Sequence, residues 1–312
     1  MAGSPRPVPA RRALLFTCGV LLLSACQRTP SPEAVSATAR PAQAVRTLSR
    51  HLRDNDLQAF ARDAVPPALH AQLEAAWRDG RTRWPLDELP FDDRLPSMLR
   101  ALSAPGAEAS LQRVFDKQFS GARAQIAGAA ASLGVFGAQY IQQQGHYSAE
   151  ERQHYAQLIQ AASRWGVSAP LADRARAQGA LAELTRAARQ AGLASEADFR
   201  TAGLDESLRR LGPFAAAFKQ ALVLYGLDLD ASLDAMQVTL QQQTGDTARV
   251  RMRYRVGAQE IDTVVSVRRI DGRWYLDDYL RHARAAVAGK PAASSIPTAR
   301  HAVPAGSAGL RR

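Results

Sequence analysis

Asp278 is the residue of this chain whose type and position best fit a chemical role. It follows a segment of alternating apolar residues and is predicted to share the inward face of a strand with Trp274 and Leu276. A carboxylate buried on that face has a raised pKa and can act as an acid, a base or a group that orients a ligand. At the open end of a sheet the same carboxylate is solvated or paired, and we favour this second interpretation.

Three further side chains complete a candidate ligand-binding set on the same predicted sheet. Arg269 is expected opposite Trp274, where a guanidinium stacks on an indole ring, so a structural stacking pair is the simpler interpretation. Tyr254 is expected on the apolar face, opposite Ile261. We therefore predict a ligand site made of Asp278, Trp274, Arg269 and Tyr254, and no catalytic residue.

His146, Glu150 and His154 are spaced four residues apart, as metal ligands on one helix face can be. Ser148 is the better helix N-cap, however, and places His146 before the helix begins. The three side chains then share no face, and we predict no metal site. A further acidic group lies in a loop that lacks calcium-ligand spacing and is expected to be solvated: Asp87, Glu88, Asp92 and Asp93.

Motifs of common enzymes are missing from the sequence. It contains no Gly-x-Ser-x-Gly elbow, no glycine-rich phosphate loop and no His-Glu-x-x-His pair. These absences count against common hydrolases and nucleotide-dependent enzymes. We expect no cofactor and a protein that is not an enzyme.

The candidate residues are carried by an antiparallel sheet, which we predict over residues 236–282. In 249–256 arginine alternates with apolar residues, as in a half-buried strand. Turns at 257–258 and 271–272, and a three-residue loop at 244–246, fold the segment into a four-stranded meander. The predicted pairs are Leu240–Val250, Val238–Met252, Met236–Tyr254, Val250–Val265, Tyr254–Ile261, Arg253–Asp262, Arg255–Glu260, Val267–Leu276 and Arg269–Trp274.

The four arginines of this strand form a stripe that could bind anionic lipid, a cell-wall polymer or a partner. Their predicted cross-strand neighbours Glu260 and Asp262 neutralise half of the stripe, so we favour a solvated sheet face. The stripe consists of Arg249, Arg251, Arg253 and Arg255.

Residues 42–235 are predicted to be mainly helical, which makes the fold class α+β: a mostly helical body followed by the C-terminal four-stranded antiparallel meander. Polar residues at 54–56 break one helix, and Ser148-Ala149-Glu150-Glu151 begins another as a capping box. The uncharged run 124–144 has small residues at helical spacing. This pattern favours tight packing in a helical core over insertion into a membrane.

The N-terminus has the order of an export signal, with three arginines before the apolar run 13–23. Leu23-Ser24-Ala25-Cys26 follows this run and resembles the lipobox of bacterial lipoproteins. The resemblance implies that residues 1–25 are removed, that the Cys26 thiol is acylated, and that the chain is anchored in a lipid bilayer. Gln27 after the cysteine implies sorting to the periplasmic face of the outer membrane.

The segments that flank the predicted fold are polar. Residues 26–41 are expected to form a flexible tether, and 283–312 a disordered basic tail. Of the net charge of +11, three charges lie in the N-terminal signal and five in the tail, which leaves +3 for the rest of the chain. This balance does not favour nucleic acid as a partner.

Residues 44–73 and 271–277 together resemble the nuclear transport factor 2-like cone fold of many small bacterial lipoproteins. In that fold, helices pack on a curved antiparallel sheet and enclose a pocket. More than 100 mainly helical residues separate the two stretches here. Either a helical insertion interrupts the cone, or a helical domain precedes an unrelated sheet.

With these resemblances, the expected function is that of a lipid-anchored accessory protein of the cell envelope that binds a protein partner or an amphiphile. An envelope enzyme or small-ligand binder with a pocket near Asp278 is the alternative. A periplasmic immunity-type protein is a second alternative, for which the sequence offers neither support nor refutation.

Overall fold

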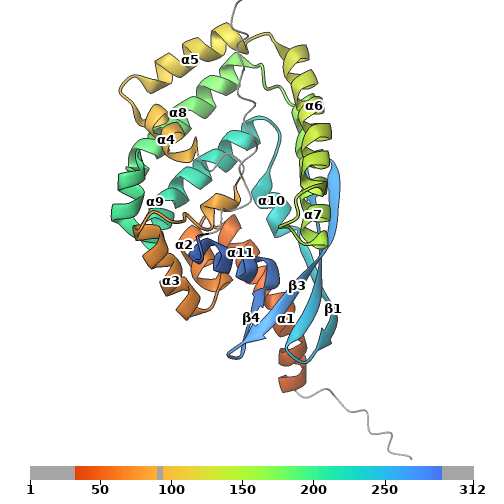
Figure 1. Cartoon of the computed structure of the whole chain (residues 1–312). Coiled ribbons are helices and arrows are strands. Elements are labelled where there is room, and N and C mark those ends of the chain that lie inside the picture. Colours follow the sequence, from red (N-terminus) through yellow and green to blue (C-terminus); the bar gives the residue numbers. More distant parts are fainter. Residues whose placement is uncertain (1–31, 90–93, 290–312) are drawn as a thin grey trace, which may run out of the picture.

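A four-stranded antiparallel sheet lies beside a helical body in the computed structural model (Figure 1). The structure describes residues 32–89 and 94–289, and only the backbone over 32–40. The predicted α+β fold class is confirmed. Cys26, the signal 1–25 and residues 290–312 lie outside the described residues.

The sheet has the simple strand order β1-β2-β3-β4 and the register that the sequence predicts. Its strands are β1 (Gln237–Thr244), β2 (Thr247–Val256), β3 (Gln259–Ile270) and β4 (Arg273–Leu276). The confirmed pairs are Leu240–Val250, Val238–Met252, Val250–Val265, Tyr254–Ile261, Arg253–Asp262, Arg255–Glu260, Val267–Leu276 and Arg269–Trp274. Met236 precedes β1, so its predicted pairing with Tyr254 is not part of the ladder.

The first hairpin differs from the prediction in its loop. Thr244 pairs with Thr247, which leaves a two-residue turn rather than a three-residue loop. The register shifts between Leu240 and Gln242, so the extra residue sits in a bulge inside β1. Because the bulge takes up one residue, the apolar side chains of β1 stay on the same face of the sheet and keep their partners.

The helical body comprises ten α-helices and a short 3₁₀-helix within the described residues. The first are α1 (Pro32–Arg53), α2 (Leu57–Ala64), α3 (Pro67–Arg78), η1 (Leu86–Glu88), α4 (Leu95–Ser103) and α5 (Ala107–Gln118). They are followed by α6 (Arg123–Gln142), α7 (Ala149–Ser168), α8 (Arg174–Ala191), α9 (Glu196–Leu224) and α10 (Leu229–Asp234). One more helix, α11 (Asp277–Val287), follows the sheet.

The boundaries at both ends of the fold differ from the predicted ones. Helix α1 begins at Pro32, so residues 32–41 of the predicted tether are helical, as their alanine content favours. Helix α11 contains the last part of the predicted sheet and the first part of the predicted tail. Two aspartates in its first turn favour the helix dipole, and Leu280, Ala283 and Ala286 are buried at helical spacing.

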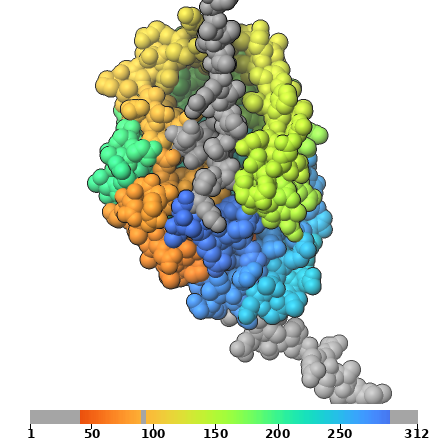
Figure 2. Space-filling model, in the orientation of Figure 1, coloured from red at the N-terminus to blue at the C-terminus, as the bar shows by residue number. Residues whose placement is uncertain are grey.

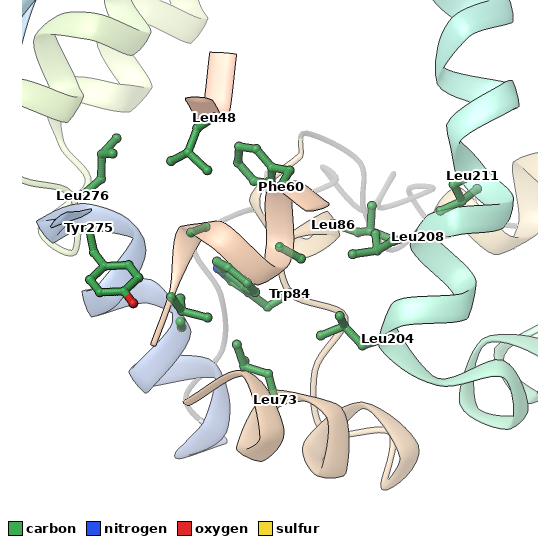
Figure 3. Packing of buried hydrophobic residues seen from close by; sticks show 14 of the residues in the cluster. Leu48, Phe60, Leu73, Trp84, Leu86, Leu204, Leu208, Leu211, Tyr275 and Leu276 are labelled. Carbon is green, nitrogen blue, oxygen red and sulfur yellow. The ribbon is translucent and has the colours of Figure 1, made fainter. Parts of the chain in front are cut away.

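One apolar cluster joins the helices to the sheet. It extends in sequence from Ala42 in α1 to Ala286 in α11 and includes Val250 and Val267 of the sheet. Helix α1 contacts β1, β2 and β4. Figure 3 shows Leu204 and Leu208 of α9 directed toward Trp84 and Leu86. The helical residues between the two cone-like stretches therefore share the core of the sheet.

Helices α6 and α7 pack closely but lie outside this core. A Cβ atom on Gly134 would meet the Ser163 Oγ at 2.2 Å, and one on Gly166 would lie 3.1 Å from the Ala130 Cβ. The close approach was predicted, whereas the burial of α6 in a helical core was wrong, because α6 packs mainly on α7 and Phe136 is 68% exposed. Figure 2 shows these two helices, in yellow-green, along one side of the molecule.

Helix α6 is also too weakly apolar to span a bilayer. Within residues 32–89 and 94–289, no helix has both the length and the hydropathy that crossing a membrane requires.

Helix α9 is interrupted at Gly203, where φ is 79° and ψ is 177°. The Glu74 Oε2 atom accepts hydrogen bonds from the backbone N–H groups of Leu204 (2.7 Å) and Asp205 (3.4 Å), which begin the second half of the helix. A carboxylate here satisfies N–H groups that lack an intrahelical partner. Glycine is required because L residues rarely adopt this positive φ, and a Cβ atom would also meet the Glu74 carboxylate.

We expect Gly203→Ala to lower the free energy of unfolding by at least about 2 kcal/mol, since this backbone region is essentially restricted to glycine and the new methyl group displaces Glu74. Gly128→Ala is the matched control, because Gly128 lies in α6 with open space around it and alanine favours the helix by about 0.5–1 kcal/mol. Urea unfolding of both variants measures the difference. Equal stabilities would contradict the role assigned to Gly203.

Candidate functional site

Asp278 lies in the first turn of α11, not on a strand. Its predicted place on the inward face of the sheet is wrong, because β4 ends at Leu276 and the chain turns into a helix. The Asp278 side chain is 19% exposed, and its Oδ1 atom accepts a hydrogen bond from the Arg281 Nη2 at 2.8 Å. The carboxylate is therefore largely buried and paired.

Trp274 and Arg269 form the stacking pair that the register predicts. The Arg269 Cζ atom lies 5.6 Å from the centre of the Trp274 ring, and the ring is buried in the main core. The Arg269 guanidinium also pairs with Asp246 at 2.6 Å. The Arg269 guanidinium and the Trp274 ring therefore already have partners within the protein.

Tyr254 is hydrogen-bonded to a histidine of α7, with 2.7 Å between its hydroxyl and the His154 Nε2. Burial lowers the pKa of His154 to about 4, an effect that the negative charge of Asp278 partly opposes. The His154 ring is therefore neutral at pH 7. Burial also raises the pKa of Tyr254, and Tyr279 of α11 adds to this effect. Two of the four predicted residues therefore affect His154: Tyr254 is hydrogen-bonded to it, and the charge of Asp278 influences its pKa.

Asp278 belongs to an ion-paired cluster, which we define as Glu88, Glu151, Asp278, Arg281 and His282. The His282 Nδ1 atom is hydrogen-bonded to the Glu88 Oε2 at 2.7 Å. The His282 Nε2 atom lies 3.2 Å from the Glu151 Oε1, which is an ion-pair distance without hydrogen-bond alignment. Arg281 binds the carboxylates of both Glu151 and Asp278. The cluster therefore ties η1, α7 and α11 together.

The electrostatics of the cluster follow from burying three carboxyl groups with one arginine and one histidine. Burial, and then the charge of Asp278, raises the pKa of Glu151. Burial by itself would lower the pKa of His282, but the hydrogen bond and the charge of Glu88 raise it instead. These groups are engaged with one another, which is the pattern of a structural ion-pair network rather than of an exposed nucleophile and its base.

The expectation that the acidic loop is solvated is wrong for its first two residues. Asp87 is buried, and its Oδ2 atom accepts hydrogen bonds from the Thr82 hydroxyl (2.6 Å) and the Arg83 backbone N–H (3.0 Å). Glu88 is part of the ion-paired cluster. Asp92 and Asp93 lie outside the described residues. Asp87 is thus held by donors a few residues before it, whereas Glu88 finds its partner in His282 of the distant helix α11.

Ser148 is the N-cap of α7, as predicted, and His146 lies before the helix begins. In the part of the chain that the structure describes, no three histidine, cysteine or acidic side chains are arranged to hold a metal ion.

An apolar cavity of about 390 Å³ lies between α5, α7, α8 and α9. Its lining contains no charged side chain, and three partly exposed residues of this lining are Val114, Phe119 and Phe218. The volume falls within the range of about 300–1,000 Å³ that is typical of small-molecule sites. Further lining residues are Leu111, Phe115, Trp165, Leu181, Leu184, Leu222 and Tyr225. Asp278 is not part of this lining.

Sequence reasoning missed both the cavity and most of the cluster. The apolar residues of α8 and α9 signal helices, but their spacing does not distinguish a filled interface from an open one. Glu88 and His282 are separated by 194 residues, so no local pattern links them.

We expect His154→Gln to flatten the pH dependence of stability between pH 6.5 and pH 4. The folded-state pKa of His154 is about 4, below its unfolded value, so folding loses stability as the pH falls through this range. The difference corresponds to about 3 kcal/mol, and glutamine keeps a hydrogen-bonding group for Tyr254 without titrating. Urea unfolding at several pH values measures the effect. Parallel profiles for the two proteins would contradict it.

Comparisons with protein-family models, with curated proteins and with solved structures found no match for this chain. Function is therefore argued from the geometry of the cavity and the cluster.

Proposed function

We propose that this chain is a lipid-anchored protein of the cell envelope that binds the aliphatic chain of an amphiphile and catalyses no reaction. The observation that carries the proposal is the apolar cavity between α5, α7, α8 and α9. An uncharged, hydrophobic lining recognises hydrocarbon, because each methylene transferred from water gains about 0.8 kcal/mol.

The exposed apolar residues of the lining support a bound ligand. Phe218 is 49% exposed and Phe119 is 43% exposed, although both are large and apolar. Large apolar side chains grouped on a surface mark binding sites more often than isolated ones do. A ligand chain in the cavity would cover part of this area.

The ion-paired cluster supports binding over catalysis. Each of its three carboxylates already has an arginine or histidine partner. A general acid or base has to reach a reacting atom of the substrate, and these groups are engaged with one another instead.

The lipobox-like sequence supports the anchor. Acylation of Cys26 would tether the chain to the bilayer, and Gln27 favours the periplasmic face of the outer membrane as its location. A protein held at a membrane is well placed to meet amphiphiles.

A protein partner is the second candidate, and helix α6 favours it. Leu133, Val135 and Phe136 are exposed on a helix that packs mainly on α7. Such a face can pack against another protein of the envelope.

We expect Phe218→Gln to weaken binding of lauric acid by roughly five- to thirtyfold, which corresponds to about 1–2 kcal/mol of lost apolar contact. Phe136→Gln is the control, because it removes an equally large exposed ring from α6, outside the cavity. Native mass spectrometry of the full chain with added lauric acid measures both. The proposal is wrong if neither the unmodified protein nor the control binds the acid.

We expect Cys26→Ser to abolish incorporation of radiolabelled palmitate during growth of cells that express the full chain. Cys18→Ser is the matched control, since Cys18 lies in the predicted signal and is not the acylated residue. Label that persists in the Cys26→Ser protein would rule out the anchor.

A further inference from the structure

A polar groove of about 710 Å³ lies where the turn between α9 and α10 faces the adjoining ends of β2 and β3. Its charged and hydroxyl-bearing lining residues come from three elements and a turn. They are Asp228, Ser232, Arg253, Tyr254, Arg255 and Glu260.

The two arginines of the groove differ from the other two in their stripe. Arg251 pairs with Asp262, with 2.7 Å between Nε and Oδ1, and Arg249 lies 3.6 Å from Glu150. Among the described residues, Arg253 and Arg255 form no ion pair with a carboxylate. Arg253 donates to the Gln237 Oε1 and Arg255 to the Ala258 carbonyl, each at 3.0 Å. Both guanidinium groups therefore have donors left for an anion, and phosphate is the anion whose geometry they fit best.

The groove also contains two carboxylates. Asp228 accepts the Ala231 backbone N–H with Oδ1, and Glu260 lies directly across from Arg255 in the sheet. A ligand with negative charge only would gain from the arginines and be repelled by the acids. A ligand that carries a phosphate and an ammonium group satisfies both.

The groove and the apolar cavity adjoin. Tyr225 lines the cavity and the next residue, Gly226, lines the groove. The Trp165 ring of the cavity donates its N–H to the Tyr225 carbonyl at 3.0 Å, and a Cβ on Gly257 of the groove would lie 4.0 Å from the Trp165 Cβ. Trp165 and Leu222, which line the cavity, pack in one apolar cluster with Leu227, which follows Gly226 of the groove.

We propose that the groove binds the headgroup of the amphiphile whose chain occupies the cavity, and that this headgroup is zwitterionic, with a phosphate on Arg253 and Arg255 and an ammonium on Glu260 and Asp228. The inference rests on the proposed function, since it assigns the polar end of the same ligand. It makes the ligand class a phospholipid or lysophospholipid with an amino headgroup.

The test compares three lauroyl ligands on the full chain by native mass spectrometry: lysophosphatidylethanolamine, lysophosphatidylglycerol and uncharged monolaurin. We expect lysophosphatidylethanolamine to bind about five- to tenfold more tightly than either of the others, as exposed charge pairs allow. In the double variant R253Q/R255Q this preference disappears while monolaurin still binds. R249Q is the matched control and keeps the preference, because Arg249 is outside the groove.

The outcomes separate the two proposals. Equal binding of all three ligands would overturn the headgroup assignment and leave the chain-binding cavity intact. Tighter binding of lysophosphatidylglycerol would show an anion site and overturn the zwitterion. Failure of all three ligands to bind would overturn the proposed function itself.

Discussion

The apolar face of the C-terminal sheet is the constraint on which the rest of the structure depends. Both cysteines of the chain precede residue 32, so stability in the described residues rests on apolar burial and not on disulfides. The meander presents Val250, Val265 and Val267 on one side. Exposing these apolar side chains to water would be unfavourable in free energy, so other elements must cover them. Helix α1 packs on the sheet and α9 packs on α2 and α3, so the first and last described helices, α1 and α11, share one core.

The edge of the sheet imposes a second demand. Strand β4 pairs only with residues 267–270, which leaves the first part of β3 without a strand on that side. The Gln157 side chain of α7 fills this place, because its amide accepts the Asp262 N–H at 2.9 Å and donates to the Asp262 carbonyl at 3.0 Å. The Gln157 side chain thus satisfies the backbone groups that a neighbouring strand would pair with. This pairing protects the edge from other strands and holds α7 beside the sheet.

Several charged groups inside the fold are held by partners from distant elements. Lys219 is only 8% exposed, and its ammonium binds the Leu52 and Arg53 carbonyls at the end of α1 together with Asp230. Glu74 caps the second half of α9, and the ion-paired cluster joins α7 to α11. These charged groups are engaged within the protein, whereas the apolar cavity and the polar groove have side chains with contacts left for a ligand.

Features that depend on neighbours in sequence were predictable. The turns at 257–258 and 271–272 and the alternation of β2 determine the strand register, and Ser148 begins α7 as its side chain indicates. These outcomes follow from backbone hydrogen bonds and side-chain periods that act over a few residues. The helical start of α1 and the helix at Asp278 escaped prediction, because local composition there suits more than one conformation.

What the sequence by itself determined is therefore the α+β order of elements, the pairing of the strands and the cap of α7. Only the tertiary structure decided that Glu88 meets His282 across 194 residues, that α6 remains outside the core, and that α5, α7, α8 and α9 leave an open cavity. The physical reason is that burial and charge pairing between distant segments depend on how whole helices pack. The spacing of residues along a short stretch of sequence does not predict that packing.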